Sequence, residues 1–110
     1  MKKMRAEELL ELRDAIAGLQ EFVGYFSNMD YPHFYKFLDY MKNNIEIYIC
    51  LGEKDFGTLE MLLIRDWYQA NNSWTGLTSF QVAQEVSEES IEIYYNYALL
   101  VKNVADYFAE

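Results

Sequence analysis

Residues that could act as a nucleophile or a general base are few in this chain. There is one histidine, His33, and one cysteine, Cys50. Because a nucleophile needs a base within hydrogen-bonding reach, a catalytic pair would have to join His33 to Cys50 or to a serine. Cys50 lies in the apolar run 47–51, which is typical of an inert core thiol. His33 follows Pro32 at the start of a predicted helix, where we expect a surface or capping role.

Carboxylates and glycines show no catalytic pattern either. The chain has 18 acidic residues, but their spacing selects no pair for glycosidic chemistry. Gly52 and Gly57 are not followed by the Lys-Ser/Thr sequence of a phosphate-binding loop, and no Gly-x-Gly occurs. We therefore expect no catalytic residues and a protein that is not an enzyme.

Metal ligands are equally sparse. Structural zinc needs several cysteine or histidine ligands, and a di-iron carboxylate bundle needs Glu-x-x-His on two helices. The chain meets neither requirement. Glu88, Glu89 and Glu92 could bind a divalent cation weakly, but the helix dipole already explains acids in a first helical turn. The sequence predicts neither a metal site nor a cofactor.

The stretch between Arg65 and Lys102 has the most distinctive composition. It contains no lysine or arginine, but it holds five acidic and seven aromatic residues. Such a region repels phosphates and suits a basic or apolar surface of another protein. The residues that we predict to bind a partner are Glu88, Glu89, Glu92, Tyr95, Tyr97 and Trp74.

Three tyrosines near the end of this stretch cannot share one helix face. Successive helical residues rotate by about 100°, so Tyr94, Tyr95 and Tyr97 point in different directions. If Tyr94 is buried, Tyr95 or Tyr97 is left for an acidic and aromatic patch beside the glutamates. The alternative is that Tyr95 and Tyr97 pack against other helices of the same bundle.

Charge argues against direct binding of nucleic acid. The net charge is −9, and the only cluster of cations is formed by Lys2, Lys3 and Arg5. The range 79–93 resembles a helix-turn-helix pattern. Its second helix, however, would present glutamates to the DNA phosphates, which is the wrong sign. A helix-turn-helix-like regulator therefore stays an alternative.

Length and composition predict one domain over 1–110 that stays in the cytoplasm. Hydrophobic residues make up 52% of the 110 residues, which is enough for a core. A single cysteine fits a reducing compartment. Charged residues follow Met1 too closely for a signal peptide, and no stretch is apolar enough for a transmembrane helix, so we expect no membrane association.

Apolar spacing predicts an all-α fold, a small bundle of four main helices and one short helix. The main helices are expected over about 4–26, 31–51, 58–70 and from Ser87 onward, and the short helix over 78–86. Asp30 is expected to cap the second helix, Thr78 the short one and Ser87 the last. The third helix is apolar nearly all round, so we expect it to be central or buried on two sides.

Two features leave alternatives open. The tetrapeptide Ile-Glu-Ile-Tyr occurs at 45–48 and again at 91–94, so an α+β fold with a short strand pair at 45–50 and 91–95 is possible. The last helix is expected to bury a seam of Ile91, Tyr94, Ala98, Val101, Ala105 and Phe108. This seam matches the spacing of the first helix, so the two terminal helices could pair within the chain or across a homodimer.

These features together predict a non-enzymatic protein-protein interaction module. The expected function is that of a small inhibitor, immunity or adaptor protein that binds a basic surface of its partner. The alternatives are a self-associating helical protein, a helix-turn-helix-like regulator, and a bundle that binds a small molecule in an aromatic-lined core.

Overall fold

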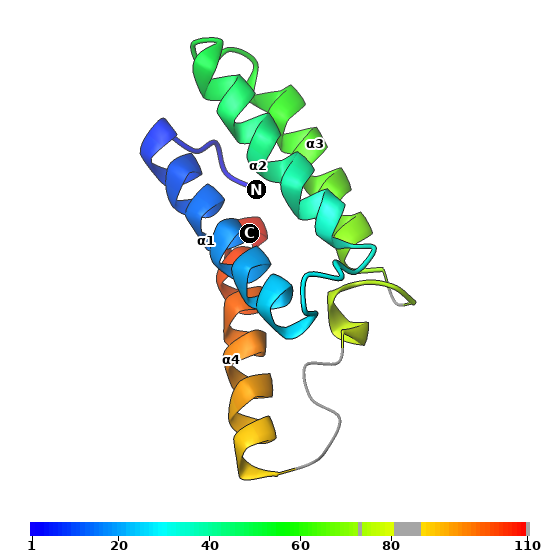
Figure 1. Cartoon of the computed structure of the whole chain (residues 1–110). Coiled ribbons are helices and arrows are strands. Elements are labelled where there is room, and N and C mark those ends of the chain that lie inside the picture. The colour runs from blue at the N-terminus through cyan, green and yellow to red at the C-terminus, as the bar shows by residue number, and fades with distance from the viewer. Residues whose placement is uncertain (73, 81–86, 110) are drawn as a thin grey trace.

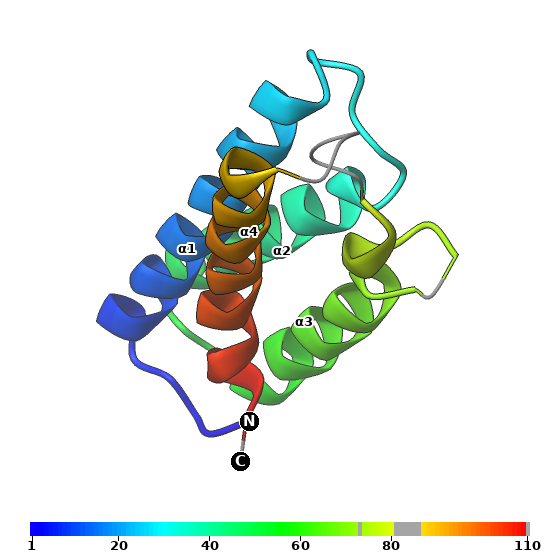
Figure 2. The same ribbon diagram turned by 90° about the horizontal axis from the view of Figure 1, so that it is seen from below.

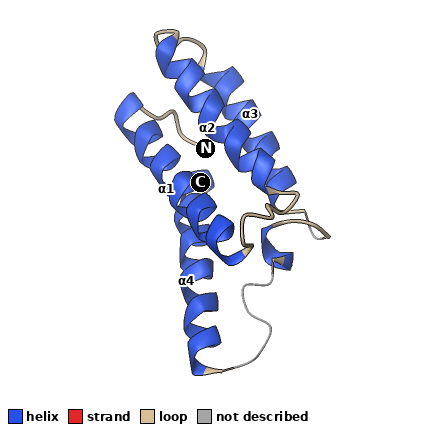
Figure 3. Ribbon diagram, viewed as in Figure 1, coloured by secondary structure: helices blue, strands red, loops and turns tan. Residues whose placement is uncertain are grey.

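The structure is a computed structural model that describes residues 1–72, 74–80 and 87–109. Every regular element in the described part is helical (Figure 3). The main helices are α1 (Ala6–Phe26), α2 (Tyr35–Cys50), α3 (Phe56–Ala70) and α4 (Glu88–Ala105), and two short 3-10 turns are η1 (Leu77–Ser79) and η2 (Asp106–Phe108). The all-α prediction is confirmed. The strand-pair alternative is wrong, because 45–50 and 91–95 both lie in helices.

The molecule consists of two helix pairs joined through α1. Helices α2 and α3 form a hairpin, and α1 packs against both α2 and α4 (Figures 1 and 2). The terminal helices therefore pair within one chain. The resulting body is elongated, with extents of 48 × 21 × 21 Å.

The core is built on the apolar stripes of α1 and α2. Both stripes match the spacing that the sequence predicts. Their fully buried members are Leu9, Leu12, Ile16, Leu19 and Val23 on α1, with Phe34, Leu38, Met41 and Ile45 on or next to α2. Each such side chain contributes about 1.5–3 kcal/mol by leaving water, so this interface is the main source of stability.

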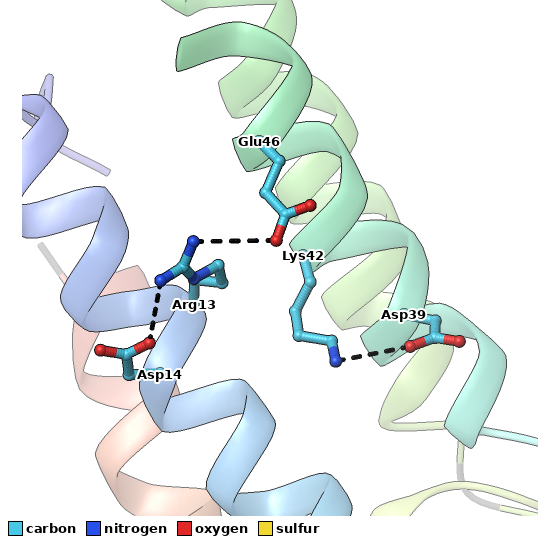
Figure 4. A network of polar contacts seen from close by, with 5 residues as sticks. All are labelled: Arg13, Asp14, Asp39, Lys42 and Glu46. Atoms are coloured by element: carbon cyan, nitrogen blue, oxygen red, sulfur yellow. Dashed lines mark hydrogen bonds and ion pairs between the residues drawn. The ribbon is translucent and has the colours of Figure 1, made fainter. Parts of the chain in front are cut away.

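Polar contacts join α1 to α2 along the edge of this core (Figure 4). Arg13 lies 3.3 Å from Asp14 on its own helix and 3.7 Å from Glu46 on α2. The buried side chain of Gln20 donates a hydrogen bond of 3.0 Å to Asp39, which is also paired with Lys42. These contacts fix the register of the two helices. They add little to the stability of the fold, because exposed ion pairs contribute little free energy.

Helix α3 differs from its prediction. It buries a single face, formed by Leu59, Leu63, Asp66 and Ala70. Met61, Ile64 and Tyr68 are exposed on the opposite face. The prediction of a central helix is wrong, because α3 lies at the edge of the fold and packs mainly against α2.

Helix α4 is turned relative to its predicted seam. Its buried residues are Ser90, Tyr97 and Val104, and Ile91 is 61% exposed. The predicted seam is wrong in its first half, where Ile91, Tyr94 and Ala98 are exposed, whereas Val101, Ala105 and Phe108 are partly buried. The apolar pattern misses the buried face because two of the buried positions carry hydroxyl groups. Ser90 satisfies its hydroxyl group against Ser87, while Tyr97 donates to the carbonyl of Leu77, so both can be buried.

Helix starts were predicted with mixed success. Ser87 caps α4 as expected, in a reciprocal pair of hydrogen bonds with Ser90. Asp30 does not cap α2, because that helix begins only at Tyr35. Within the predicted short helix 78–86, Thr78 and Ser79 belong to η1 and Phe80 follows it. Residues 81–86 lie outside the described residues.

The two residues considered for catalysis are both at the surface. Cys50 is exposed at the end of α2, so the prediction of a core thiol is wrong. His33 is also exposed, as expected, and its ring lies edge-on to Phe37. The apolar run around Cys50 is helical, so only some of its residues face the core.

Two carboxyl groups of the α3 segment have opposite environments. Asp66 is 1% exposed, and loss of solvation raises its pKa, although Arg65 at 3.1 Å opposes the shift. Asp55 caps α3, and hydrogen bonds from the hydroxyl and backbone N–H of Thr58 lower its pKa.

These environments predict stability changes of opposite sign. Because the folded pKa of Asp66 lies above the unfolded value, its ionisation costs stability as pH rises through the folded pKa. Asp66→Asn should therefore raise the urea midpoint at pH 7, and the gain should vanish at acid pH where wild-type Asp66 is neutral. Asp55→Ala removes the same charge but should lower the midpoint at pH 7. A lower midpoint for Asp66→Asn at pH 7 would show that the Arg65 pair outweighs desolvation.

Candidate protein-binding surface on helix α4

The outer face of α4 carries acidic and aromatic side chains. Glu88, Glu92 and Tyr95 are exposed and are separated by four and three residues, which places them on one side of the helix. Ile91 and Leu99 are exposed beside them, at 61% and 45%. We call these five residues the α4 strip. Figure 1 shows the first turns of α4 extending beyond the end of α1, so this part of the strip projects from the bundle.

Four of the six residues predicted to bind a partner are exposed on α4. Glu88, Glu92 and Tyr95 belong to the strip, and Tyr95 is 69% exposed. Glu89 is exposed as well, but it is rotated by about 100° from Glu88 and lies at the side of the strip. The first turn of α4 is therefore acidic on two adjoining sides.

The structure places Tyr97 inside the protein. Only 6% of it is exposed, its ring stacks on Phe22 of α1 at 5.5 Å, and its hydroxyl donates to the carbonyl of Leu77 at 2.7 Å. Desolvation raises the pKa of Tyr97, so the hydroxyl group stays protonated as a donor at neutral pH. The ring of Tyr97 therefore lies inside the protein and supports the surface of α4 from below.

Trp74 lies apart from the strip. It is 87% exposed in the loop that follows α3. Figures 1 and 2 show the described part of this loop at the edge of the molecule, projecting from η1 away from α4. Trp74 is therefore not part of the α4 strip.

The two cations that bracket the stretch without lysine or arginine in the sequence are both ion-paired. Lys102 is the first lysine or arginine after Arg65 in the sequence. Its amino group lies 2.9 Å from Asp106, and the guanidinium of Arg65 lies 3.1 Å from Asp66. The glutamates of the strip thus give it a negative charge, which favours a cationic surface over a phosphate.

An apolar groove of about 420 Å³ runs beside the strip. Leu77, Thr78 and Phe80 form one wall from the η1 segment, and Tyr94, Tyr97, Ala98 and Val101 form the other from α4. Thr78 and Ala98 are exposed, so the groove opens to solvent. The groove could not be predicted from the sequence, because its two walls are separate in the chain and meet only in the folded protein.

Aromatic contacts hold the two walls together. The ring of Phe80 lies 5.6 Å from that of Tyr97 and 5.8 Å from that of Phe34. Gly76 allows the chain to turn from α3 into η1, since a Cβ atom there would overlap the backbone of Asn72. The groove is therefore a built feature of the fold, with the Tyr97–Leu77 hydrogen bond at its base.

Two other kinds of functional feature, a metal site and a membrane-spanning helix, are not found among the described residues. There, no three His, Cys, Asp or Glu residues are grouped in a way that could hold a metal ion. None of the helices in the same ranges is long and apolar enough to cross a membrane. The α4 strip and its groove are the best candidate for a functional surface.

The Tyr97–Leu77 hydrogen bond predicts a specific loss of stability. Tyr97→Phe keeps the ring but leaves the buried Leu77 carbonyl only the longer hydrogen bond from the Phe80 N–H at 3.4 Å, so unfolding in urea should become easier by about 1 kcal/mol. The matched variant Tyr95→Phe removes an exposed hydroxyl from the same helix and should change stability by less than about 0.5 kcal/mol. Equal effects of the two substitutions would contradict the role assigned to Tyr97.

Comparisons with known proteins identify no relative. No protein-family model, curated protein or solved structure matches this chain. Its function must therefore be argued from the surface itself.

Proposed function

We propose that this protein is a non-enzymatic interaction module that binds a basic surface of another protein through the α4 strip. It would act as a small inhibitor, immunity or adaptor protein in the cytoplasm. The observation that carries the proposal is the exposure of Glu88, Glu92 and Tyr95 on one face of α4. They belong to a stretch of sequence without lysine or arginine, and Lys102 at its end is paired with Asp106.

The composition of the strip supports a protein partner. Glutamates supply long-range attraction and selectivity, while an exposed tyrosine buries a large ring at little entropic cost. Ile91 and Leu99 add apolar area next to the acids. Aromatic and apolar residues are typical of the centre of a protein interface, and polar groups surround them at its rim.

The same charges argue against a nucleic acid partner. In the helix-turn-helix-like alternative, α4 would be the recognition helix and would present Glu88, Glu89 and Glu92 to the phosphates. The range 79–93 that suggested this motif also includes 81–86, which lie outside the described residues. A cationic protein surface that itself binds phosphates is a better electrostatic match for the strip.

Charge reversal on the strip tests the proposal. Glu88→Lys with Glu92→Lys should abolish capture of a basic partner from a lysate of the source cells, with loss of at least about 2 kcal/mol of binding energy. The control Glu7→Lys with Glu11→Lys changes the same charge at the same spacing on α1. Figure 1 shows the beginning of α1 and the beginning of α4 at opposite ends of their pair. The control should therefore retain the partner.

Two results would overturn the proposal. One is a partner retained equally by both double variants, which would place the interface elsewhere. The other is loss of the partner in both variants, which would indicate that total charge and not the strip is recognised. Circular dichroism of each variant confirms that a loss of binding is not a loss of helix.

A second candidate function is self-association through α3. Met61, Ile64 and Tyr68 are exposed at 62%, 46% and 77%, and their spacing puts them on one face of the helix. Two copies could pack these faces against each other about a two-fold axis. The terminal helices no longer suggest such a dimer, because α1 and α4 pair within the chain.

Sedimentation equilibrium tests whether the protein self-associates through α3. If α3 forms a dimer, the mass of the wild type should rise with concentration and Ile64→Lys should reduce it to that of a monomer. Ile47→Lys, at an exposed apolar position on α2, should leave the dimer intact. A monomer at all concentrations would eliminate self-association through α3.

A further inference from the structure

We propose that the groove between η1 and α4 receives one large apolar side chain from a cationic helix of the partner. A lysine or arginine residue of that helix would pair at the same time with Glu88, at the acidic first turn of α4. This inference rests on the proposed function and names the kind of partner segment that the surface fits.

The groove supplies the apolar half of the recognition. Its volume of about 420 Å³ and its lining by Leu77, Phe80, Tyr94 and Val101 suit a leucine, phenylalanine or tryptophan side chain. The hydroxyl group of Tyr97 is engaged by Leu77, so burial of an apolar side chain at that base would leave this hydrogen bond intact.

The groove and the acidic turn lie along one continuous row of α4. Ala98, Tyr94, Ile91 and Glu88 follow one another at spacings of four, three and three residues. With a rise of about 1.5 Å per residue, Glu88 lies about 9 Å along the helix from Tyr94 at the groove. An apolar residue and basic residues one to two turns away on a partner helix span this distance.

Charge complementarity selects the occupant. The row ends at Glu88, with Glu92 and Glu89 exposed nearby, and the described cation closest in sequence, Lys102, is bound to Asp106. An acidic or neutral helix would gain only the apolar contact, whereas a cationic helix gains both contacts. The groove therefore fits the apolar face of a basic amphipathic helix better than a second copy of this acidic chain.

The test uses a defined probe with the full chain. The probe is an amphipathic helical peptide of about 18 lysine and leucine residues, and a second peptide carries serine in place of leucine. Ala98→Phe fills the groove from an exposed position on α4, and Thr78→Phe fills it from the other wall. The charge variants are the Glu88/Glu92 and Glu7/Glu11 double lysine substitutions described above. Affinities come from calorimetry, and amide chemical shifts locate the peptide.

The expected result is that both halves of the surface contribute. Filling the groove should lower the affinity for the lysine–leucine peptide at least about tenfold, and so should reversing the charge at Glu88 and Glu92. The Glu7/Glu11 variant should stay within about twofold of wild type. Shifts should concentrate at 77–80 and 88–101, and the lysine–serine peptide should bind weakly and without change on filling the groove.

The outcomes separate this inference from the proposed function. Binding lost on charge reversal but unchanged by both groove-filling variants overturns the groove and leaves the proposed function standing. Binding unchanged by every variant overturns both. If the groove-filling variants prevent a small apolar dye from binding but leave peptide binding unchanged, the groove binds a small molecule and the inference is wrong.

Discussion

The structure depends on burial of the apolar stripe of α1 between α2 and α4. Leu9, Leu12, Ile16, Leu19 and Val23 are fully buried, and α1 packs against both of those helices. No other helix in the described residues has so long a fully buried stripe. Because hydrophobic burial is the largest favourable term in folding, the directions of α2 and α4 follow from the need to cover this stripe. Helix α3 packs mainly against α2, and its outer face remains exposed.

The candidate surface is a consequence of the same constraint. Covering α1 turns Tyr97 and Ser90 of α4 inward, and helical geometry then turns Glu88, Glu92 and Tyr95 outward. The inward tyrosine also fixes η1 through Leu77, which creates the second wall of the groove. One packing interaction therefore determines both the acidic strip and the apolar groove beside it.

The sequence predicts correctly the helices whose buried residues are all apolar. It does not predict the buried face of a helix whose inward residues are polar and need a hydrogen-bond acceptor inside the fold. The stripes of α1 and α2 could be found because period and hydrophobicity agree there. The buried face of α4 could not, since Ser90 and Tyr97 carry hydroxyl groups that only the folded structure satisfies. Charge and aromatic content singled out Glu88, Glu92 and Tyr95, which are exposed on one face of α4, and their binding to a partner stays a prediction. Trp74 lies elsewhere, and the groove needed contacts between 77–80 and α4 that no local pattern reveals.

The most direct test of the α4 surface is photo-crosslinking in the source cells. A photoreactive phenylalanine derivative would replace Tyr95 of the strip in one strain and Tyr68 of α3 in another, since both tyrosines are well exposed. We predict that the Tyr95 position crosslinks to a basic protein and that the Tyr68 position does not. Crosslinks from Tyr68 to a partner or to a second copy, with none from Tyr95, would contradict the account.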